Sequence, residues 1–344
     1  MIALVIVVVA LAVAVTNRSS TKTLSPPPVS IPGYTVVYAV TTNAQGVQRS
    51  TRTVSVRRPF ESSDLSVPEN AVAPDQGFVT SVDGLFALQG GKIITFGSQA
   101  PGVPSSDYRL SVELNDMTRL GLAEVRGQSS VAGRSCRVYR VGSPLGDPLK
   151  KASDQEYTDL CLDADGLVLS EKWMLSGQLL RDSEATSVSL AVPPTASFAA
   201  PAGPQTPNPS GVGQTTSLPL NAPPSTGNPY WLTTSPPWGF SLANRVRAVT
   251  VNALSGATDL AFVDSYVRGS DVVLVQHRER SVAGPPASGM ERITAGRLGT
   301  GELTLSDEGP RASFVAGPWV ITVEGSVDVA HLRAFASQLA PVGP

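Results

Sequence analysis

The segments VAGRSCRVYRV (residues 131–141) and YTDLCLDADGLVLSEKWMLSGQLLRDSEATSV (residues 157–188) decide the fold that this sequence predicts. Both are rich in β-branched and aromatic residues that roughly alternate with polar ones, which is the pattern of antiparallel strands. Asp165-Gly166 favours a tight hairpin turn, and Gly177-Gln178 separates the two longest predicted strands. We therefore expect an antiparallel meander over residues 131–188.

The only two cysteines of the chain, Cys136 and Cys161, lie on two predicted strands of this meander. Their spacing is too wide for a redox motif and they are too few for a metal site, which favours one disulfide. Two buried free thiols are the alternative. A disulfide closing a loop of about 25 residues would stabilise the fold by about 3–4 kcal/mol in the chain-entropy model.

Length and composition exclude several classes of protein. The chain has 344 residues, a formal net charge of −2 and 16% charged residues. This length allows two domains with cores of their own. The 31 glycines and 29 prolines favour short strands and turns over a helical bundle. No basic face is visible that would bind a nucleic-acid backbone, so we expect no nucleic-acid partner.

The N-terminus carries an apolar run over residues 2–15. This run is short for a membrane span and typical of a signal peptide, although no Lys or Arg precedes it. A start at an internal methionine, with a cytoplasmic segment upstream, would also explain that missing charge. We predict a signal peptide or membrane anchor over residues 1–18 and a proline-rich tether over residues 19–33. The rest of the chain is then extracytoplasmic, secreted or anchored in the cell envelope.

Further strand patterns extend the meander into a larger sheet. The predicted strands before it cover residues 34–42, 47–58, 78–82, 85–88 and 92–96. Pro59 ends the second of these strands, and a polar loop leads to the third. A partial apolar stripe predicts a helix from Ser111 to Val125. Residues 34–200 are therefore predicted to form a curved antiparallel sheet, a half-barrel, with one helix.

A composition change separates this domain from a second one. No Asp, Glu, Lys or Arg occurs from Ala185 to Asn244, and proline recurs there. We predict a poorly ordered linker over residues 201–229, with a long functional loop as the alternative. Residues 230–344 are predicted to form a smaller α+β domain, an antiparallel sheet covered by a C-terminal helix that Ser326 or Asp328 caps. The predicted fold class of the whole chain is α+β.

The motifs of catalysis and metal binding are missing from this sequence. The only histidines, His277 and His331, have no further ligand at metal-binding spacing, and we expect both to face solvent. No nucleophile elbow, zinc-protease motif or phosphate loop occurs. The Asp163–Gly166 turn lacks the Glu of a calcium loop, because Met174 occupies that position. We expect no enzyme activity, no cofactor and no metal.

The strand after the hairpin turn carries the candidate ligand-binding residues. One of its faces is apolar apart from Glu171, and the apolar residues on this face are Leu167, Leu169, Trp173 and Leu175. On a flat sheet such a face would be core. On a curved, half-open barrel it would line an apolar hollow, and both interpretations remain open.

Three short motifs resemble those of a known family. The sequence VAGRSCRVY (residues 131–139) is similar to the family's strand entry, and CLDADGLVLSE (residues 161–171) is similar to its strand, Asp-x-x-Gly turn and returning strand. PWGF (residues 237–240) is similar to the start of its small second domain. The family is the lipoprotein-carrier-like (LolA-like) superfamily, and the nearest type is the RseB/MucB regulators of sigma-E. The end of the chain (residues 319–339) resembles the last strand and helix of small domains on bacterial membrane-anchored regulators.

The resemblance implies a half-barrel that binds acyl chains or an apolar peptide segment. It also implies a second domain that docks a membrane-bound partner such as an anti-sigma factor, without covalent chemistry. Our leading prediction is accordingly a regulatory binding protein of the cell envelope. A carrier of lipids or lipoproteins on the same fold is the second possibility, and a hydrolase of envelope material is the third.

Overall fold

The computed structural model describes most of the chain after the predicted tether begins. The described residues are 24–28, 30–44, 46–81, 84–95, 110–142, 151–207, 211–252, 258–280, 291–306 and 309–343. The predicted signal peptide or anchor over residues 1–18 lies outside these ranges. Within them, no helix combines the length and the apolar character that crossing a bilayer requires.

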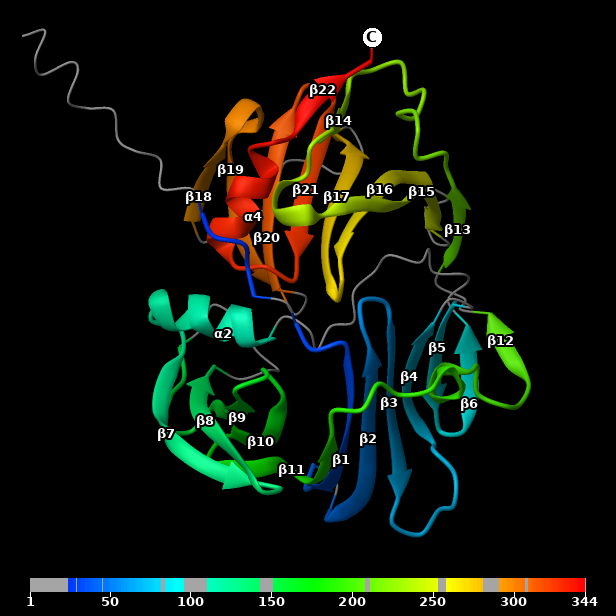
Figure 1. The fold of residues 1–344 in the computed structure, drawn as a ribbon. Coiled ribbons are helices and arrows are strands. Elements are labelled where there is room, and N and C mark those ends of the chain that lie inside the picture. The colour runs from blue at the N-terminus through cyan, green and yellow to red at the C-terminus, as the bar shows by residue number, and fades with distance from the viewer. Residues whose placement is uncertain are drawn as a thin grey trace, which may run out of the picture.

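The first half of the chain forms one open sheet in which almost all neighbours are antiparallel. The strands in chain order are β1 (Gly33–Thr42), β2 (Gln48–Arg57), β3 (Glu61–Pro68), β4 (Gln76–Ser81), β5 (Gly84–Gln89), β6 (Lys92–Thr95), β7 (Glu124–Val131), β8 (Arg134–Val141), β9 (Tyr157–Asp163), β10 (Val168–Leu175), β11 (Gln178–Ser189) and β12 (Gln205–Pro207). Their order across the sheet is β12-β6-β5-β4-β3-β2-β1-β11-β10-β9-β8-β7. The strands β7–β11 curl beneath helix α2 (Leu110–Arg119), and β2–β6 continue on the other side of β1 (Figure 1).

Two apolar clusters hold the curled part of this sheet. The larger joins side chains of β1 and β2 to the disulfide between Cys136 and Cys161, whose Cα atoms are 5.4 Å apart. The predicted disulfide is therefore present. The second cluster packs Leu114 and Met117 of α2 against Tyr139, Leu160 and Leu162 of β8 and β9. These alternating positions became strands because each strand buries one set of side chains.

Two local predictions for this sheet were wrong. The segment predicted as a polar loop after Pro59 contains β3, which pairs with β2 on one side and β4 on the other. The helix predicted to reach Val125 ends at Arg119, since Gly121 adopts a positive φ of 70° and β7 begins at Glu124.

The second half of the chain forms a separate eight-stranded sheet. Its strands are β13 (Gly211–Ser217), β15 (Ser241–Asn252), β16 (Thr258–Arg268), β17 (Asp271–Glu279), β18 (Glu291–Ala295), β19 (Gly299–Ser306), β20 (Gly309–Ala316) and β21 (Trp319–Gly325), in the order β13-β15-β16-β17-β21-β20-β19-β18. Helix α4 (Val329–Ala336) packs on this sheet, and Asp328 caps it by accepting a hydrogen bond from the His331 backbone N–H. A short pair, β14 (Tyr230–Leu232) and β22 (Ala340–Val342), completes the domain.

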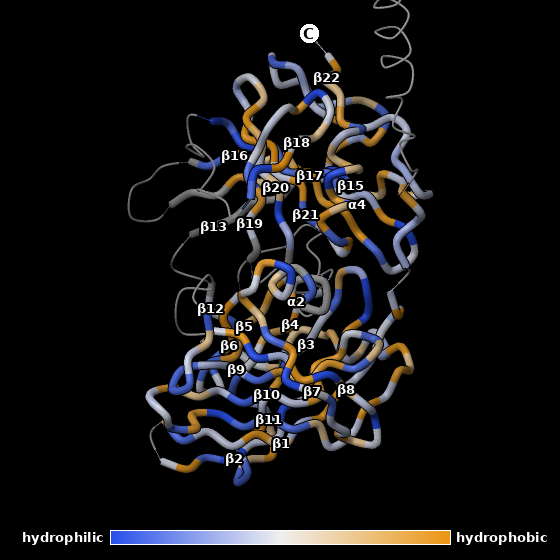
Figure 2. Tube along the Cα trace, turned by 90° about the vertical axis from the view of Figure 1, so that its left-hand side faces the viewer, coloured by the Kyte–Doolittle hydropathy of each residue, from blue (hydrophilic) through white to orange (hydrophobic). Residues whose placement is uncertain are grey.

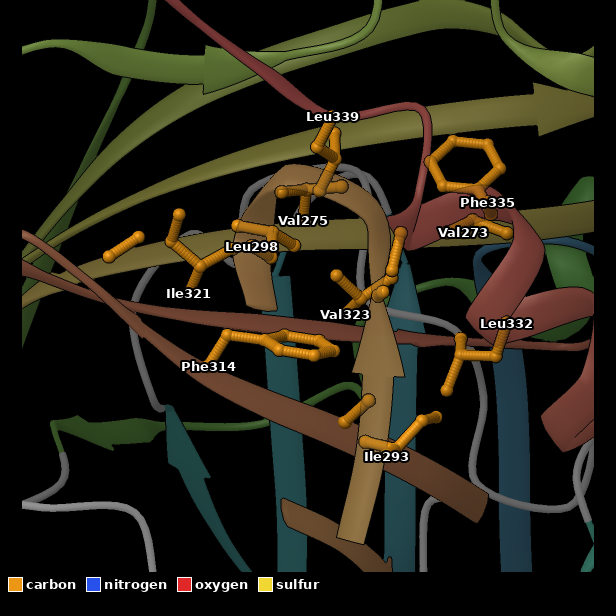
Figure 3. Close-up of a cluster of buried hydrophobic side chains, with 14 of the residues drawn as sticks. Val273, Val275, Ile293, Leu298, Phe314, Ile321, Val323, Leu332, Phe335 and Leu339 are labelled. Atoms are coloured by element: carbon orange, nitrogen blue, oxygen red, sulfur yellow. The ribbon is translucent and has the colours of Figure 1, made fainter. Parts of the chain in front are cut away.

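The core of the C-terminal domain lies between α4 and its sheet. Leu332 and Phe335 of α4 are fully buried against Val273, Phe314 and Val323 of the sheet (Figure 3). Hydrophobic residues concentrate along these central strands and α4 (Figure 2). The predicted closing helix on an antiparallel sheet is therefore confirmed, with Asp328 as its cap.

The α+β prediction is confirmed only in part, because the described chain is mostly β with few helices and its larger sheet is open. The predicted linker also contains strands. Its first part, β12, pairs in parallel with β6 of the first sheet, and β13 pairs with β15 of the second. A charge-free, proline-rich composition did not prevent these backbone ladders, since ladder bonds use main-chain groups.

The two domains contact each other at several points. Phe60 of the first domain packs against Val272 and Leu274 of β17. Helix α2 lies against β20, and the Arg119 guanidinium forms an ion pair of 3.1 Å with Glu291. The contacts between the domains thus include an apolar one, at Phe60, and an ion pair, between Arg119 and Glu291.

Candidate ligand-binding site

The structure separates the four predicted lining residues into two pairs. Leu167 and Leu169 are 2% and 0% exposed and belong to the cluster that contains the disulfide. Trp173 and Leu175, further along β10, are only half-buried. The first pair therefore packs as core, and only the second pair lies where a ligand could reach it.

One guanidinium lies over the Trp173 ring, and further charged side chains lie near that arginine. The Arg181 guanidinium on β11 lies 5.0 Å from the centre of the Trp173 ring. Its nearest carboxylate is Glu171, at 3.9 Å. Arg52 and Asp64, on β2 and β3, make a bidentate pair with donor–acceptor distances of 2.7 and 2.5 Å. We call Arg52, Asp64, Glu171 and Arg181 the central charged cluster.

Burial affects the pKa of both arginines in this cluster. Burial is the largest influence on Arg181 and lowers the pKa of its guanidinium below the usual value, while Glu171 raises it. Arg52 is affected differently. Burial lowers its pKa, but the hydrogen bond and charge of Asp64 more than offset this, so the pKa of Arg52 is raised. Arg52 is thus fully paired, whereas Arg181 is held by a loose ion pair.

Buried polar atoms of Trp173 and of its two cross-strand partners have no hydrogen-bond partner in the part of the chain that the structure describes. They are the indole nitrogen of Trp173, Nε of Arg181 on β11 and the hydroxyl of Thr158 on β9. A buried donor without a partner costs about 1–3 kcal/mol, so such atoms call for a physical explanation. Each of the two nitrogen donors needs an oxygen acceptor that the described residues do not supply.

The described residues also line two pockets elsewhere. A pocket of about 370 Å³ lies near the disulfide, between Asn115 of α2 and the Asp163–Gly166 turn. A pocket of about 530 Å³ in the C-terminal domain lies between the segment 218–226 and Trp319. Neither is lined by a predicted ligand-binding residue.

The prediction that both histidines face solvent was wrong. His277 is fully buried, its ring stacks on Tyr230 at 4.1 Å, and its Nε2 lies 2.8 Å from the Trp231 carbonyl oxygen. His331 is 8% exposed and lies between Asp328 and the carbonyl of Ser25. Trp231 and Ser25 are far from these histidines in the sequence, so sequence spacing does not reveal these contacts.

The buried imidazole of His277 predicts an acid-sensitive domain. Burial lowers the pKa of His277 to about 3. A lowered folded-state pKa stabilises the fold fully above about pH 6.5, and this contribution is lost as the pH falls towards 3. We expect a loss of about 2 kcal/mol of unfolding free energy by about pH 5. Denaturant unfolding at several pH values should show it.

His277→Phe is the control for this acid sensitivity. It keeps an aromatic ring against Tyr230 but cannot take up a proton. Its unfolding free energy should be lower at neutral pH, because the Trp231 carbonyl loses a donor. The slope of the unfolding free energy against pH, between about 6.5 and 4, should fall by the equivalent of about one bound proton. Equal slopes in both proteins would show that another group causes the acid sensitivity.

No cluster of three or more His, Cys, Asp or Glu able to hold a metal ion occurs among the described residues. The carboxylates of the central charged cluster each face an arginine instead. The site thus combines an aromatic ring, apolar side chains and arginine–carboxylate pairs.

The central charged cluster was not predicted, although a signal for it exists. Arg52 occurs at the same alternating position as Val54 and Val56, which are buried. Its β1 neighbour in the sheet is Tyr38, and the guanidinium lies 5.5 Å from that ring centre. An arginine in phase with core valines indicates a buried charge that needs a partner.

Comparison with known proteins gives matches among solved structures. No protein-family model matches the chain, and no curated protein matches it. A crystal structure of MucB shares 17% identity, covers 90% of this chain and 93% of its own, and has a TM-score of 0.32. The Pseudomonas aeruginosa MucA/MucB complex shares 16% identity, covers 91% of this chain and 94% of its own, and has a TM-score of 0.30. LprF from Mycobacterium bovis shares 12% identity, covers 47% of this chain and 89% of its own, and has a TM-score of 0.24.

These matches include MucB, the type of protein that the sequence motifs resemble.

Proposed function

We propose that this protein is a noncatalytic binding protein of the cell envelope, and that its ligand is an apolar chain with an oxygen-bearing head group. A free fatty acid or the acyl part of a lipid has this chemistry. The observation that carries the proposal is the group of unpartnered buried donors beside the half-buried Trp173.

The proposed binding mode uses both parts of the site. The ligand's apolar chain contacts Trp173 and Leu175, and its burial contributes about 25 cal/mol per Å² before the cost of association. The head-group oxygen accepts hydrogen bonds from the Trp173 indole and from Nε of Arg181. A ligand carboxylate would also pair with the Arg181 guanidinium, which Glu171 holds only at 3.9 Å.

The disulfide between Cys136 and Cys161 supports an oxidising compartment, and hence a location outside the cytoplasm. We further infer from the sequence resemblance that the bound state is read by a membrane-bound partner such as an anti-sigma factor. The C-terminal domain is the part of the chain that we assign to this partner.

A fluorescent long-chain fatty acid titrated into the purified full chain tests the ligand class. We expect saturable binding that Trp173→Ala and Arg181→Met each weaken by about tenfold or more, because each removes a contact to the chain or to the head group. Mass spectrometry of the purified protein should detect co-purified lipid.

Lys172→Met is the matched control for these variants. Lys172 neighbours Trp173 on β10 and its side chain is exposed. The variant should bind the probe within about twofold of the wild type, since it lies outside the site. Binding that is absent, or that ignores both Trp173→Ala and Arg181→Met, would refute the proposal.

A further inference from the structure

Residues 24–28 lie against the C-terminal domain, although they precede the first strand of the N-terminal sheet. We call this segment the strap. Three of its backbone carbonyls, those of Leu24, Ser25 and Pro27, each meet a different side chain of the second domain. The donors are Nε1 of Trp238 at 3.1 Å, Nε2 of His331 at 2.8 Å and a guanidinium nitrogen of Arg268 at 2.8 Å. We call Trp238, Arg268 and His331 the strap site.

One of the three carbonyls belongs to a proline, Pro27, and the Pro28 carbonyl lies 3.5 Å from the same Arg268 nitrogen. Proline has no N–H, so the carbonyl oxygens are the main-chain groups that Pro26, Pro27 and Pro28 can offer. In a polyproline segment these oxygens have no internal partner, and aromatic surfaces with an indole donor are a known way to bind them. Pro27 is also buried, so the strap gives up apolar surface as well as carbonyls.

Each donor of the strap site is held in place by another group of the same domain. The imidazole of His331 is fixed by Asp328, whose carboxylate lies 2.8 Å from Nδ1. Arg268 is fixed by Asp271 at 2.6 Å. The Trp238 ring packs edge-on against the His331 ring, with centroids 5.0 Å apart. Because these side chains are already held in place, less conformational entropy is lost when a segment binds to them.

The backbone of Trp238 is strained. Its φ is 57°, in the left-handed region, where a side chain costs about 1–2 kcal/mol relative to the ordinary conformation. The residue lies in a short 3₁₀ turn between Pro237 and Gly239. Strained residues persist where the surroundings fix them, and they cluster at ligand sites. Here the strain accompanies an indole whose N–H reaches the strap.

We propose that the strap site is a binding site for extended proline-rich segments, occupied within the same chain by residues 24–28. Recognition through carbonyl oxygens and one buried proline ring requires an extended proline-rich backbone rather than one particular sequence, so a proline-rich segment of another protein binds there once the strap leaves. This site lies in the C-terminal domain and is independent of the acyl-chain site proposed at Trp173.

Emptying the site tests this proposal in the full chain. Pro26→Gly/Pro27→Gly/Pro28→Gly removes the preorganisation of the strap and should release it. A labelled peptide with the sequence KTLSPPPVS (residues 22–30) is then titrated by fluorescence anisotropy. We expect it to bind the triple variant at least about tenfold more tightly than the wild type, because the tethered strap competes at a local concentration of about millimolar.

Two comparisons distinguish the strap site from nonspecific binding. Trp238→Phe in the triple variant keeps a ring but removes the N–H, and should weaken the peptide by about tenfold. Trp231→Phe, the same exchange elsewhere in this domain, should leave binding within about twofold. A peptide with its three prolines replaced by glycine should bind weakly to the wild type and to all of these variants. This control changes the peptide and leaves the strap site intact.

Two outcomes would overturn the proposal. One is the absence of peptide binding by the triple variant when its thermal unfolding matches that of the wild type. The other is binding that Trp238→Phe leaves unchanged, or that the glycine peptide reproduces. Fatty-acid binding measured on the same triple variant should equal that of the wild type, so failure here is distinguishable from failure of the acyl-chain proposal.

Discussion

Replacing Arg245 with methionine is expected to lower the unfolding free energy of the C-terminal domain by about 3–5 kcal/mol. Arg245 and Asp264 are 1% and 0% exposed and form a bidentate pair at 2.6 and 2.8 Å. Arg245 also donates to the carbonyl of Ala222 at 2.7 Å. The substitution leaves a buried carboxylate without its cation. Burial already raises the pKa of Asp264, and Arg245 is the main group that lowers it.

Tryptophan fluorescence during denaturant unfolding can measure this loss in one domain. Trp173 is the only tryptophan of the N-terminal domain, so a Trp173→Phe background leaves three reporters, all in the C-terminal domain. Arg278→Met is the matched control, because its ion pair with Asp259 is 37% and 32% exposed. That variant should lose less than about 1 kcal/mol.

A double variant separates the cost of the unpaired charge from the cost of the lost side-chain volume. Arg245→Met combined with Asp264→Leu removes both charges and should recover much of the stability lost in Arg245→Met. Comparable unfolding free energies for Arg245→Met and Arg278→Met would contradict the structural role of the buried pair.

The second large effect is expected from the disulfide. Cys136→Ala/Cys161→Ala should lower the unfolding free energy of the N-terminal domain by about 3–4 kcal/mol, since the sequence separation is 25 residues and the unfolded chain gains the freedom of that loop. Unfolding followed through Trp173, in a background with the other tryptophans replaced by phenylalanine, measures this loss.

Reduced wild-type protein is the control for the deleted sulfur atoms. It lacks the crosslink but keeps both side chains, which are 4% and 2% exposed. We expect it to lose most of the same stability. A reduced protein as stable as the oxidised one would mean that the crosslink contributes little to this domain.

The sequence predicted those parts of the fold where local pattern and packing agree. The strands around the disulfide alternate because each buries one face, and Asp328 caps α4 through a local bond. Residues 61–68 did not show such a pattern, because β3 is polar and is defined by pairing with strands on both of its sides. No sequence window contains that information.

The candidate site shows a similar division. An apolar face on β10 predicts burial, but it does not tell core from ligand contact, and the structure places Leu167 and Leu169 in the core. The central charged cluster comes from four strands that the sheet brings together. The histidines needed partners far along the chain, such as the Ser25 carbonyl for His331, and so could not be placed from sequence.

The strap also determines how the molecule would carry mechanical load. The chain passes between the domains twice, once from the strap into β1 and again from β12 to β13 (Figure 1). Two crossings restrain the domains more than a single flexible tether would. A pull on the N-terminus is therefore borne first by Trp238, Arg268 and His331. It reaches β1 only after those bonds and the Ser30 bonds to Asp271 have broken, so the C-terminal domain shields the larger sheet from tension.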